Sequence, residues 1–307
     1  MLRQAQHEAP FLQLTSHPST SSNLRTGAAL VVAASAAFVL IDATAKLLIH
    51  DHGTLQIVWA RYVFNLAAFV VVLAAGRTLT SLVATRRIGL HCLRAATMLF
   101  SAYIYFVALR HITLAEATAL AGLAPFIVTA CAGRLLGEQV GARQWVAVAL
   151  GFAGALFIIK PGFAGFHWAM LLAVLCACTR AGYNMATRAL GTTEDAMTTL
   201  FYGALIGSIV SSAVVPFDWV MPSLPSLALM VVLGISGMVG HFLIIKAYQH
   251  APSSALAPFS YTDLAWATLY GMALFAELPD IASLIGMALI AAAGVTSVWP
   301  ARPLRTG

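Results

Sequence analysis

The chain has 307 residues, of which 60% are hydrophobic and only 9% are charged. A water-soluble domain carries roughly 25% charged residues, so a soluble core of this size could not hide the apolar side chains. The net charge of +6 does not indicate nucleic-acid binding, because the arginines lie at the ends of apolar runs and form no single basic patch. The composition predicts a polytopic membrane protein and excludes a soluble domain.

The apolar residues fall into ten runs, most of them near the roughly 20 residues that a helix needs to cross a bilayer. The runs are continuous rather than alternating, which favours helices over the strands of a barrel. We therefore expect an all-α polytopic membrane protein with ten transmembrane helices. The expected spans are Thr26–Ile49, Thr54–Ala75, Gly89–Arg110, Thr113–Leu136, Gln144–Ile159, His167–Leu190, Ala196–Pro216, Ser226–Tyr248, Pro252–Ala276 and Ile281–Val298.

Two tails and one central break divide the chain. Residues 1–25 are polar and lack the basic start, apolar stretch and small-residue cleavage site of a signal peptide, so we expect a disordered cytoplasmic tail. Residues 299–307 form a second cytoplasmic tail. The Pro/Gly stretch Lys160–Gly165 separates two halves of five helices each, residues 26–160 and 166–298.

One segment occurs twice in the chain. Ala108–Glu138 returns as Ala247–Glu277 with an offset of 139 at both ends. Each copy has an apolar stretch that ends near a His, then a polar turn, then a second apolar run closed by a Glu. The shared spacing indicates an internal duplication. Because each half has an odd number of spans, the two repeats must be inverted, an arrangement typical of alternating-access transporters.

Arginines in the loops indicate the orientation, because cytoplasmic loops retain positive charge. The side opposite the N-terminus holds only Arg110 and Lys160. We therefore expect both termini in the cytoplasm. The arginines on the same side as the N-terminus are Arg3, Arg25, Arg77, Arg86, Arg87, Arg134, Arg143, Arg188, Arg302 and Arg305.

The chain resembles the EamA family of the drug/metabolite transporter superfamily. The words that carry the resemblance are LAPFIVTACAGRLLGEQV at Leu123–Val140, GFAGALFIIKPG at Gly151–Gly162, FAELPD at Phe275–Asp280 and WARY at Trp59–Tyr62. The resemblance covers both repeats and implies a ten-helix carrier of the inner membrane with both termini cytoplasmic.

Two residues depart from the family pattern. Ala276 stands where the family usually has Gly, and Asp263 stands where a neutral residue is more usual. The second departure lies inside a span and could bear on the substrate.

Ionisable side chains inside spans are costly in lipid, which makes them the functional candidates. Asp42 and Lys46 lie four residues apart, so they share a helix face and can neutralise one another; as a structural pair, Lys46 would extend outward. Arg61 and Arg180 each need a carboxylate, helix carbonyls or a substrate anion as a partner. Substrate contact and internal pairing both stay open for these two arginines.

Asp263 lies near the middle of the ninth span, with Tyr261 and Trp266 close by in sequence. A carboxylate at that depth is costly unless it is protonated, paired or hydrated. We expect Asp263 to couple protons or to bind substrate, unless Arg61 or Arg180 neutralises it. The aromatic neighbours could stack on a planar substrate or serve only in packing.

The remaining acidic residues in or near the spans lie at helix ends. Glu116 is expected to stabilise a helix N-terminus. Glu138 and Glu277 end symmetry-related helices at opposite membrane faces. We assign both, together with Lys46, to structural or gating roles.

Several chemistries have no matching motif. The chain has no HExxH, no nucleotide-binding GxxxxGK[ST] loop, and only Cys176 and Cys178 as closely spaced thiols, which point to different helix faces. We expect neither a metal nor a cofactor. Gly203 and Gly207 favour close internal packing and are also compatible with a homodimer.

These observations favour a secondary active transporter that moves a small organic metabolite across the cytoplasmic membrane, with protons as a candidate coupling ion. The alternatives are a channel, a non-transporting membrane protein and an intramembrane enzyme. The pattern of the second half looks most like family members that move amino-acid-like or vitamin-like metabolites, such as S-adenosylmethionine or riboflavin. Import and export are not distinguished.

Overall fold

A computed structural model describes residues 21–74, 84–135, 140–162, 165–191 and 193–298. Glu138, most of the expected N-terminal tail and all of the C-terminal tail lie outside these ranges. The helices are α1 Ser21–Leu48, α2 Thr54–Ala74, α4 Ile88–Leu109, α5 Leu114–Ala121, α6 Ala124–Leu135, α7 Ala142–Ile159, α8 Ala169–Leu190, α9 Ala196–Val214, η1 Val215–Asp218, α10 Leu224–His250, α11 Ser253–Leu256, η2 Ala257–Tyr261, α12 Thr262–Phe275 and α13 Ile281–Val298.

The all-α polytopic fold is confirmed. Within the described residues, eight helices are long and apolar enough to cross a membrane, and Ile281–Ser297 is a shorter apolar helix. One boundary was wrong: residues 21–25 belong to α1 and not to a disordered tail.

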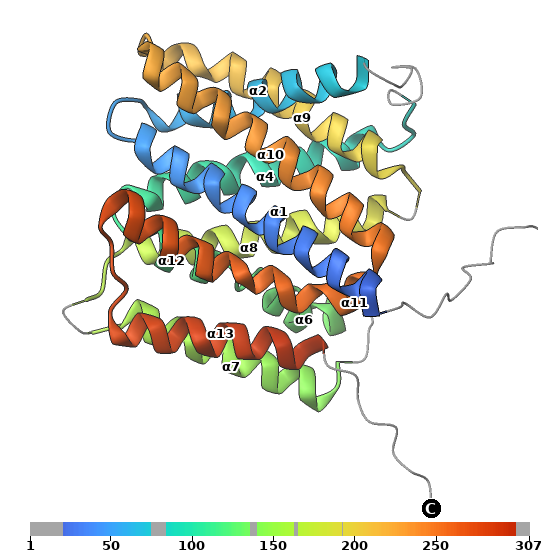
Figure 1. Ribbon diagram of the computed structural model, residues 1–307, viewed down its shortest axis with the longest axis vertical. Helices are drawn as coiled ribbons and strands as arrows, with labels where there is room; N and C mark the ends of the chain where they lie inside the picture. Colours follow the sequence, from blue (N-terminus) through green and yellow to red (C-terminus); the bar gives the residue numbers. More distant parts are fainter. Residues whose placement is uncertain (1–20, 75–83, 136–139, 163–164, 192, 299–307) are drawn as a thin grey trace, which may run out of the picture.

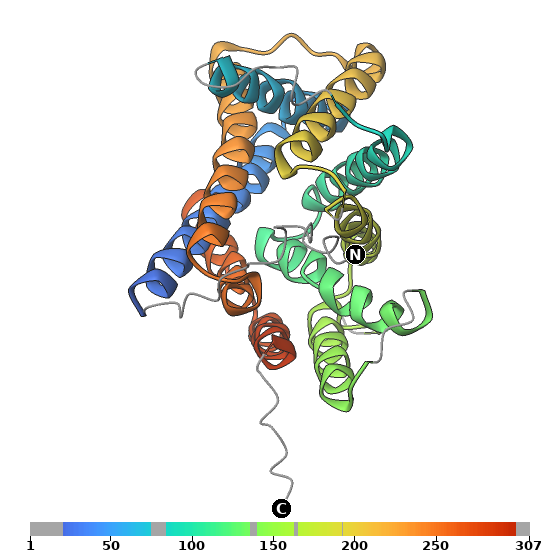
Figure 2. The same ribbon diagram turned by 90° about the vertical axis from the view of Figure 1, so that its right-hand side faces the viewer.

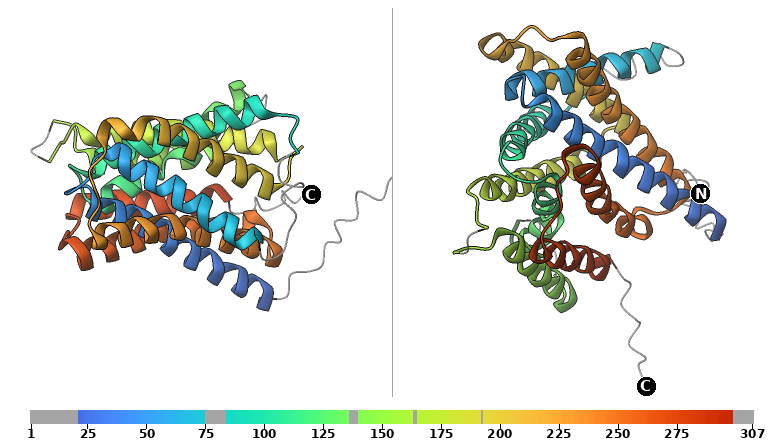
Figure 3. Two further views of the ribbon diagram at one scale, coloured as in Figure 1. Left: turned by 90° about the horizontal axis from the view of Figure 1, so that it is seen from above. Right: turned by 60° about the vertical axis from the view of Figure 1, so that its left-hand side comes forward.

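Successive helices run back and forth between two ends of the molecule. The start of α1 and the end of α13 lie at one end, which we call the terminal end, on the right in Figure 1. The turns that follow α1, α4, α7, η1 and α12 lie at the other end, which we call the far end. Seen from above, the helices run in broadly the same direction between these ends (Figure 3).

Two walls of helices face each other (Figure 2). Helix α1 packs against α10 and α12 in one wall, and α8 packs against α4, α5 and α6 in the other. Helix α2 packs on α9 at one edge, and α7 packs on α13 at the opposite edge. The contact of α1 with α10 thus has a counterpart in the contact of α8 with α4, and the contact of α1 with α12 has one in the contact of α8 with α5 and α6.

The fourth and ninth expected spans are broken rather than continuous. Helix α5 stops at Ala121 and α6 starts at Ala124, while η2 separates α11 from α12. Each LAPF word lies at a break, and its proline, Pro125 or Pro258, lacks the N–H that a continuous helix needs. Both breaks lie beside the space between the two walls, which Gly122, Pro125 and Ala257 line.

Glycines bring α9 and α10 close to α2 and α1. A Cβ on Gly207 would lie 2.2 Å from Tyr62, and one on Gly240 would lie 2.6 Å from Phe38. Any larger residue would therefore push these helices apart. The small-residue faces are used inside the chain, so a homodimer would need another surface.

Candidate functional site

A cavity of about 610 Å³ lies between the two walls. It extends toward the terminal end, where Tyr248 and Ser297 line it, and it stops before the far end, at the level of Asp42 and Thr118. The predicted site residues that line it are Asp42, Arg61, Arg180, Tyr261 and Asp263.

Each half of the chain contributes one aspartate and one arginine to this central cavity. Asp42 comes from α1 and Arg61 from α2, while Arg180 comes from α8 and Asp263 from α12. The broken helices also reach the cavity, through Pro125 and its neighbours in α6 and through Tyr261 in η2. Residues far apart in sequence thus form one charged site, which periodicity alone could not predict.

Asp42 is held by the hydroxyl of Tyr105, which donates a 3.2 Å hydrogen bond to Oδ2. The same hydroxyl lies 3.1 Å from Oγ1 of Thr118 on α5. These contacts connect α1, α4 and α5 at the inner limit of the cavity. Asp42 is therefore positioned by neutral groups.

Asp263 has an incomplete set of partners. Ser35 on α1 is a side-chain hydrogen-bond partner of its carboxyl group. Its Oδ1 atom is buried and has no hydrogen-bond partner in the described residues. A buried carboxylate oxygen without a partner is costly, so Oδ1 has room for a hydrogen-bond donor that the described residues do not supply.

Arg61 and Arg180 also lack a close counter-charge. In the described part of the chain, neither guanidinium lies within 4.0 Å of a carboxylate. Arg61 lies over the ring of Phe106 at 5.9 Å, and Arg180 lies over the ring of Tyr105 at 5.8 Å. Because cation–π contacts are weaker than ion pairs in such settings, both arginines keep donors for an anion.

Lys46 does not neutralise Asp42, and this part of the prediction was wrong. Its ammonium forms an ion pair with Glu277 and donates a 2.8 Å hydrogen bond to the carbonyl of Ile112. Glu277 also accepts a 3.0 Å bond from the backbone N–H of Leu114, the first residue of α5. Lys46 therefore faces the far end, one helical turn from the cavity.

Further contacts lie at the far end. Lys160, the residue after α7, forms an ion pair with Asp280 just before α13. The Lys160 ammonium, together with the backbone N–H of Ser283, lowers the pKa of Asp280 below its usual value. Glu116 forms a capping box with Thr113 and accepts a 3.2 Å bond from Ser283, which confirms its expected role at a helix N-terminus.

Trp266 does not line the cavity, in contrast to Asp42, Arg61, Arg180, Tyr261 and Asp263. Its indole donates a 3.1 Å hydrogen bond to the carbonyl of Val32 on α1. Its ring lies 5.8 Å from that of Tyr270. These contacts anchor α12 to α1, which is the packing alternative considered for the aromatic residues.

The sequence reasoning missed Arg94, His241 and Tyr183. Arg94 is only 4% exposed, and its guanidinium lies 4.5 Å from the ring centre of Tyr183. His241 and Tyr183 line the central cavity. The available signal was a basic residue more than one turn inside the third expected span, where burial is costly.

Membrane-length helices around a central cavity lined by charged side chains are typical of membrane transporters. The profile of the EamA-like transporter family matches residues 25–160 and again residues 167–298. The chain therefore belongs to this family, and it is a metabolite transporter.

Named relatives include both importers and exporters. An S-adenosylmethionine uptake transporter of Rickettsia bellii is 29% identical over 206 residues, covering 67% of this chain and 71% of the relative. The pseudopaline exporter CntI of Pseudomonas aeruginosa is 26% identical, and the match covers 88% of this chain and 95% of the relative. A riboflavin transporter of Vibrio cholerae is 27% identical, and the match covers 86% of this chain and 90% of the relative.

A solved crystal structure has the same fold. It superposes with a TM-score of 0.63 and 20% sequence identity, covering 90% of this chain and 97% of the other. At this identity the likeness supports the arrangement of the helices alone.

Proposed function

We propose that this protein is a secondary active transporter of a small zwitterionic metabolite, and that the central cavity is its substrate site. The observation that carries the proposal is the set of four charged side chains around this cavity. Asp42, Asp263, Arg61 and Arg180 include no ion pair within 4.0 Å among the described residues. Charges left unpaired in a membrane protein mark substrate or ion pathways.

The helix contacts support two inverted repeats, residues 26–160 and 166–298, that would exchange access between the two sides. Contacts of α1 with α10 and α12 match contacts of α8 with α4 and with α5 and α6. Each of these contacts joins a helix of one half of the chain to a helix of the other half. Rocking of one wall against the other about α2–α9 and α7–α13 would then alternate access.

The loop charges support a cytoplasmic terminal end. The described arginines at that end are Arg25, Arg86, Arg87, Arg143 and Arg188, against Arg110 and Lys160 at the far end. Positive charge is retained on the cytoplasmic side. In this orientation the described conformation faces inward, because the bonds of Lys46 to Ile112 and of Leu114 to Glu277 join the two walls at the far end, while the central cavity reaches the terminal end.

Single-cysteine labelling tests this orientation. In a background without native cysteines, a reporter at Gly165 should react with an impermeant reagent added to intact cells. Reporters at Ser19 and Arg302 should react only after the cells are opened. Labelling of Ser19 in intact cells would show that the orientation is inverted.

Two acids and two bases favour a substrate with both charges over a neutral one. S-adenosylmethionine, named for one relative, carries a carboxylate and cationic groups together with a planar base. Riboflavin, named for another, has an uncharged ring system and needs no paired charges. Tyr183 and Tyr261 line the same cavity and are available to stack on a planar base.

Counterflow in proteoliposomes tests the function directly. Vesicles loaded with unlabelled S-adenosylmethionine should concentrate the labelled compound transiently, and Arg180→Gln should lower that signal at least about tenfold. Parallel runs with riboflavin and with other amino-acid-like metabolites test the charge argument. A channel or a scaffold gives no counterflow with any of them, and that result would refute the carrier.

A further inference from the structure

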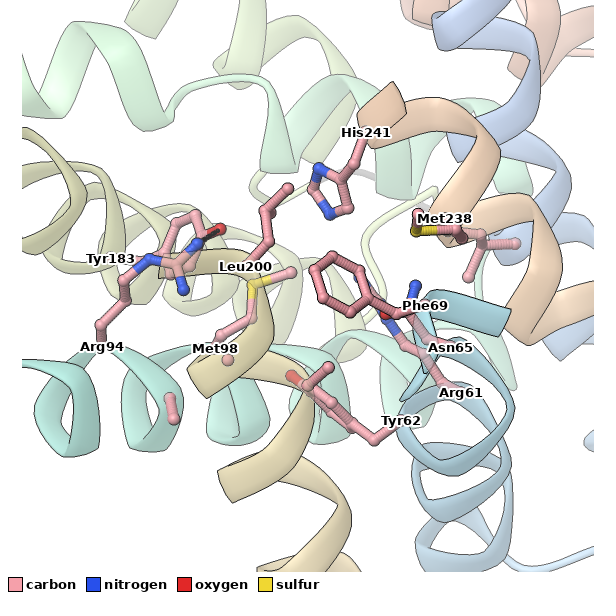
Figure 4. Close-up of a pocket in the computed structure, with 15 residues that line it drawn as sticks. Arg61, Tyr62, Asn65, Phe69, Arg94, Met98, Tyr183, Leu200, Met238 and His241 are labelled. Atoms are coloured by element: carbon pink, nitrogen blue, oxygen red, sulfur yellow. Dashed lines mark hydrogen bonds between the residues drawn. The ribbon is translucent and has the colours of Figure 1, made fainter. Parts of the chain in front are cut away.

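A second, smaller pocket adjoins the central cavity, with a volume of about 60 Å³ (Figure 4). Arg61, Tyr183 and His241 line both spaces. By this measure a cavity of about 10–15 Å³ holds one water molecule, so the side pocket has room for a group the size of a carboxylate.

The side pocket carries only basic ionisable groups apart from its tyrosines. Arg61, Arg94 and His241 line it, and no aspartate or glutamate does. Figure 4 shows Arg94 beside Tyr183 on one side of the pocket, with Arg61 and Asn65 from α2 on the other. The central cavity, by contrast, contains Asp42 and Asp263 as well as arginines.

Arg94 is held by neutral groups only. Nε donates to Thr187 at 2.8 Å, one terminal nitrogen to the carbonyl of Thr199 at 3.0 Å, and the other to the hydroxyl of Tyr183 at 2.5 Å. A guanidinium has five N–H donors, so one remains on each terminal nitrogen. The residue is pre-oriented, but no carboxylate in the described residues neutralises it.

Gly203 makes room for this guanidinium. A Cβ at Gly203 would lie 2.8 Å from a terminal nitrogen of Arg94. Any side chain there would displace the arginine without changing the charge of the pocket.

We propose that the side pocket binds the carboxylate of the transported zwitterion between Arg61 and Arg94, while the cationic part stays beside Asp42 or Asp263 in the central cavity. The inference rests on the proposed function, because it takes the bound ligand to be the transported substrate. Arg94 is fixed by its three hydrogen bonds, and Arg61 lines the same small pocket. A guanidinium offers the fork geometry that carboxylates prefer. The competing explanation is that Arg94 only ties α4 to α8 and α9.

The first test measures binding of a bare carboxylate to the purified protein. Acetate should raise the melting temperature by a few degrees more than chloride at equal ionic strength, and neutral acetamide should not. Arg94→Gln should abolish the acetate increment, and Gly203→Ala should reduce it by displacing the guanidinium. Lys246→Gln on α10 is the matched control, because Lys246 lines neither space, and it should keep the increment.

The second test uses transport. L-methionine should compete for S-adenosylmethionine counterflow at least about tenfold better than L-methioninamide, which lacks the carboxylate. Arg94→Gln should remove that preference, and Arg94→Lys should restore part of it. If Arg94→Gln weakens both competitors equally, the residue is structural and the proposal is overturned.

The two tests separate this inference from the proposed function. Equal effects of acetate and chloride on the wild-type protein overturn the carboxylate pocket even where counterflow occurs. Absence of counterflow refutes the carrier, while the acetate measurement still decides whether the pocket binds a carboxylate.

Discussion

Charged side chains form ion pairs at the far end and lack them in the central cavity, among the described residues. At the far end Lys46 pairs with Glu277 and Lys160 pairs with Asp280. In the cavity, Arg61, Arg180 and the two aspartates remain outside ion-pair distance of one another among the described residues. Asp42 and Lys46 are one helical turn apart on α1, yet they belong to different regions. Position along a helix therefore decides whether a charge is paired at the far end or left without a counter-charge in the cavity.

Paired and unpaired charges have different consequences for a moving protein. The ion pair of Lys46 and Glu277 lies within one wall, because it connects α1 to the end of α12. The same two side chains reach the other wall through the carbonyl of Ile112 and the N–H of Leu114, and these bonds stabilise one conformation and must break when the walls move. Among the described residues, the charges in the cavity make no ion pair that would have to break. Mutations at the far end should alter the conformational equilibrium, whereas mutations in the cavity should alter coupling or binding.

The largest effect is expected for Asp263→Asn. If Asp263 carries the coupling proton, the variant should keep counterflow and lose accumulation driven by a pH gradient in proteoliposomes, by about tenfold or more. If Asp263 is a substrate ligand, binding and counterflow should fall together. Asp51→Asn, in an exposed turn at the far end, should change neither.

Two further outcomes would contradict a functional role for the unpaired Asp263. Normal pH-driven uptake by Asp263→Asn, at normal folding yield, would remove Asp263 from both functional roles. Recovery of transport on joint neutralisation of Asp263 and Arg180 would mean that the two merely compensate each other's charge.

Glu277→Gln should have the next largest effect. The substitution leaves the Lys46 ammonium partly buried without its counter-charge, which costs up to about 3 kcal/mol in the closed conformation. The far end should open more often. A cysteine at Ala121, which lines the cavity, should then react several-fold faster with an impermeant reagent from outside in a background without native cysteines.

The double variant Lys46→Met with Glu277→Gln sharpens this prediction. Removing both charges of a buried pair is often neutral, so labelling at Ala121 should return toward the wild-type rate. If the single and double variants react equally fast, the bond from Leu114 to Glu277 closes the far end and the ion pair does not.

Most of the fold could be predicted from the sequence, because hydrophobic length determines which segments span a membrane. The breaks at Gly122 and in η2 were not predicted, since an apolar run that contains one proline still has the length of a span. The site was predicted in part. Depth in a span identified Asp42, Arg61, Arg180 and Asp263 as candidates.

The sequence could not show which charged residues pair with one another. The i, i+4 spacing of Asp42 and Lys46 predicted a local pair, but Lys46 found Glu277, which is 231 residues away. Such a contact depends on how α12 packs on α1, and a single sequence does not contain that geometry. For the same reason Arg94 could not be connected to Tyr183 and Thr199 in advance.

A smaller effect is expected at the turn that leads to Glu277. Ala276 has φ of 53°, in the left-handed region, which costs a residue with a Cβ about 1–2 kcal/mol. Ala276→Gly should therefore stabilise the protein by about 1 kcal/mol after the entropy cost of glycine. The melting temperature should rise by a few degrees, whereas Ala265→Gly inside α12 should lower it.

The smallest effect is expected for the exposed pair of Lys160 and Asp280, where the Asp280 side chain is 57% exposed. Its pKa is lowered in the folded protein, chiefly by the Lys160 ammonium. The stabilisation is therefore present above the ordinary aspartate pKa and is lost as the pH falls through the lower folded value. The difference in free energy of unfolding between wild type and Asp280→Asn should amount to about 0.3 kcal/mol at neutral pH. It should shrink in strong acid and in high salt. A loss of stability as large as that of Glu277→Gln would mean that burial does not determine how much a far-end ion pair stabilises the protein. The contrast between paired and unpaired charges would then not follow from burial.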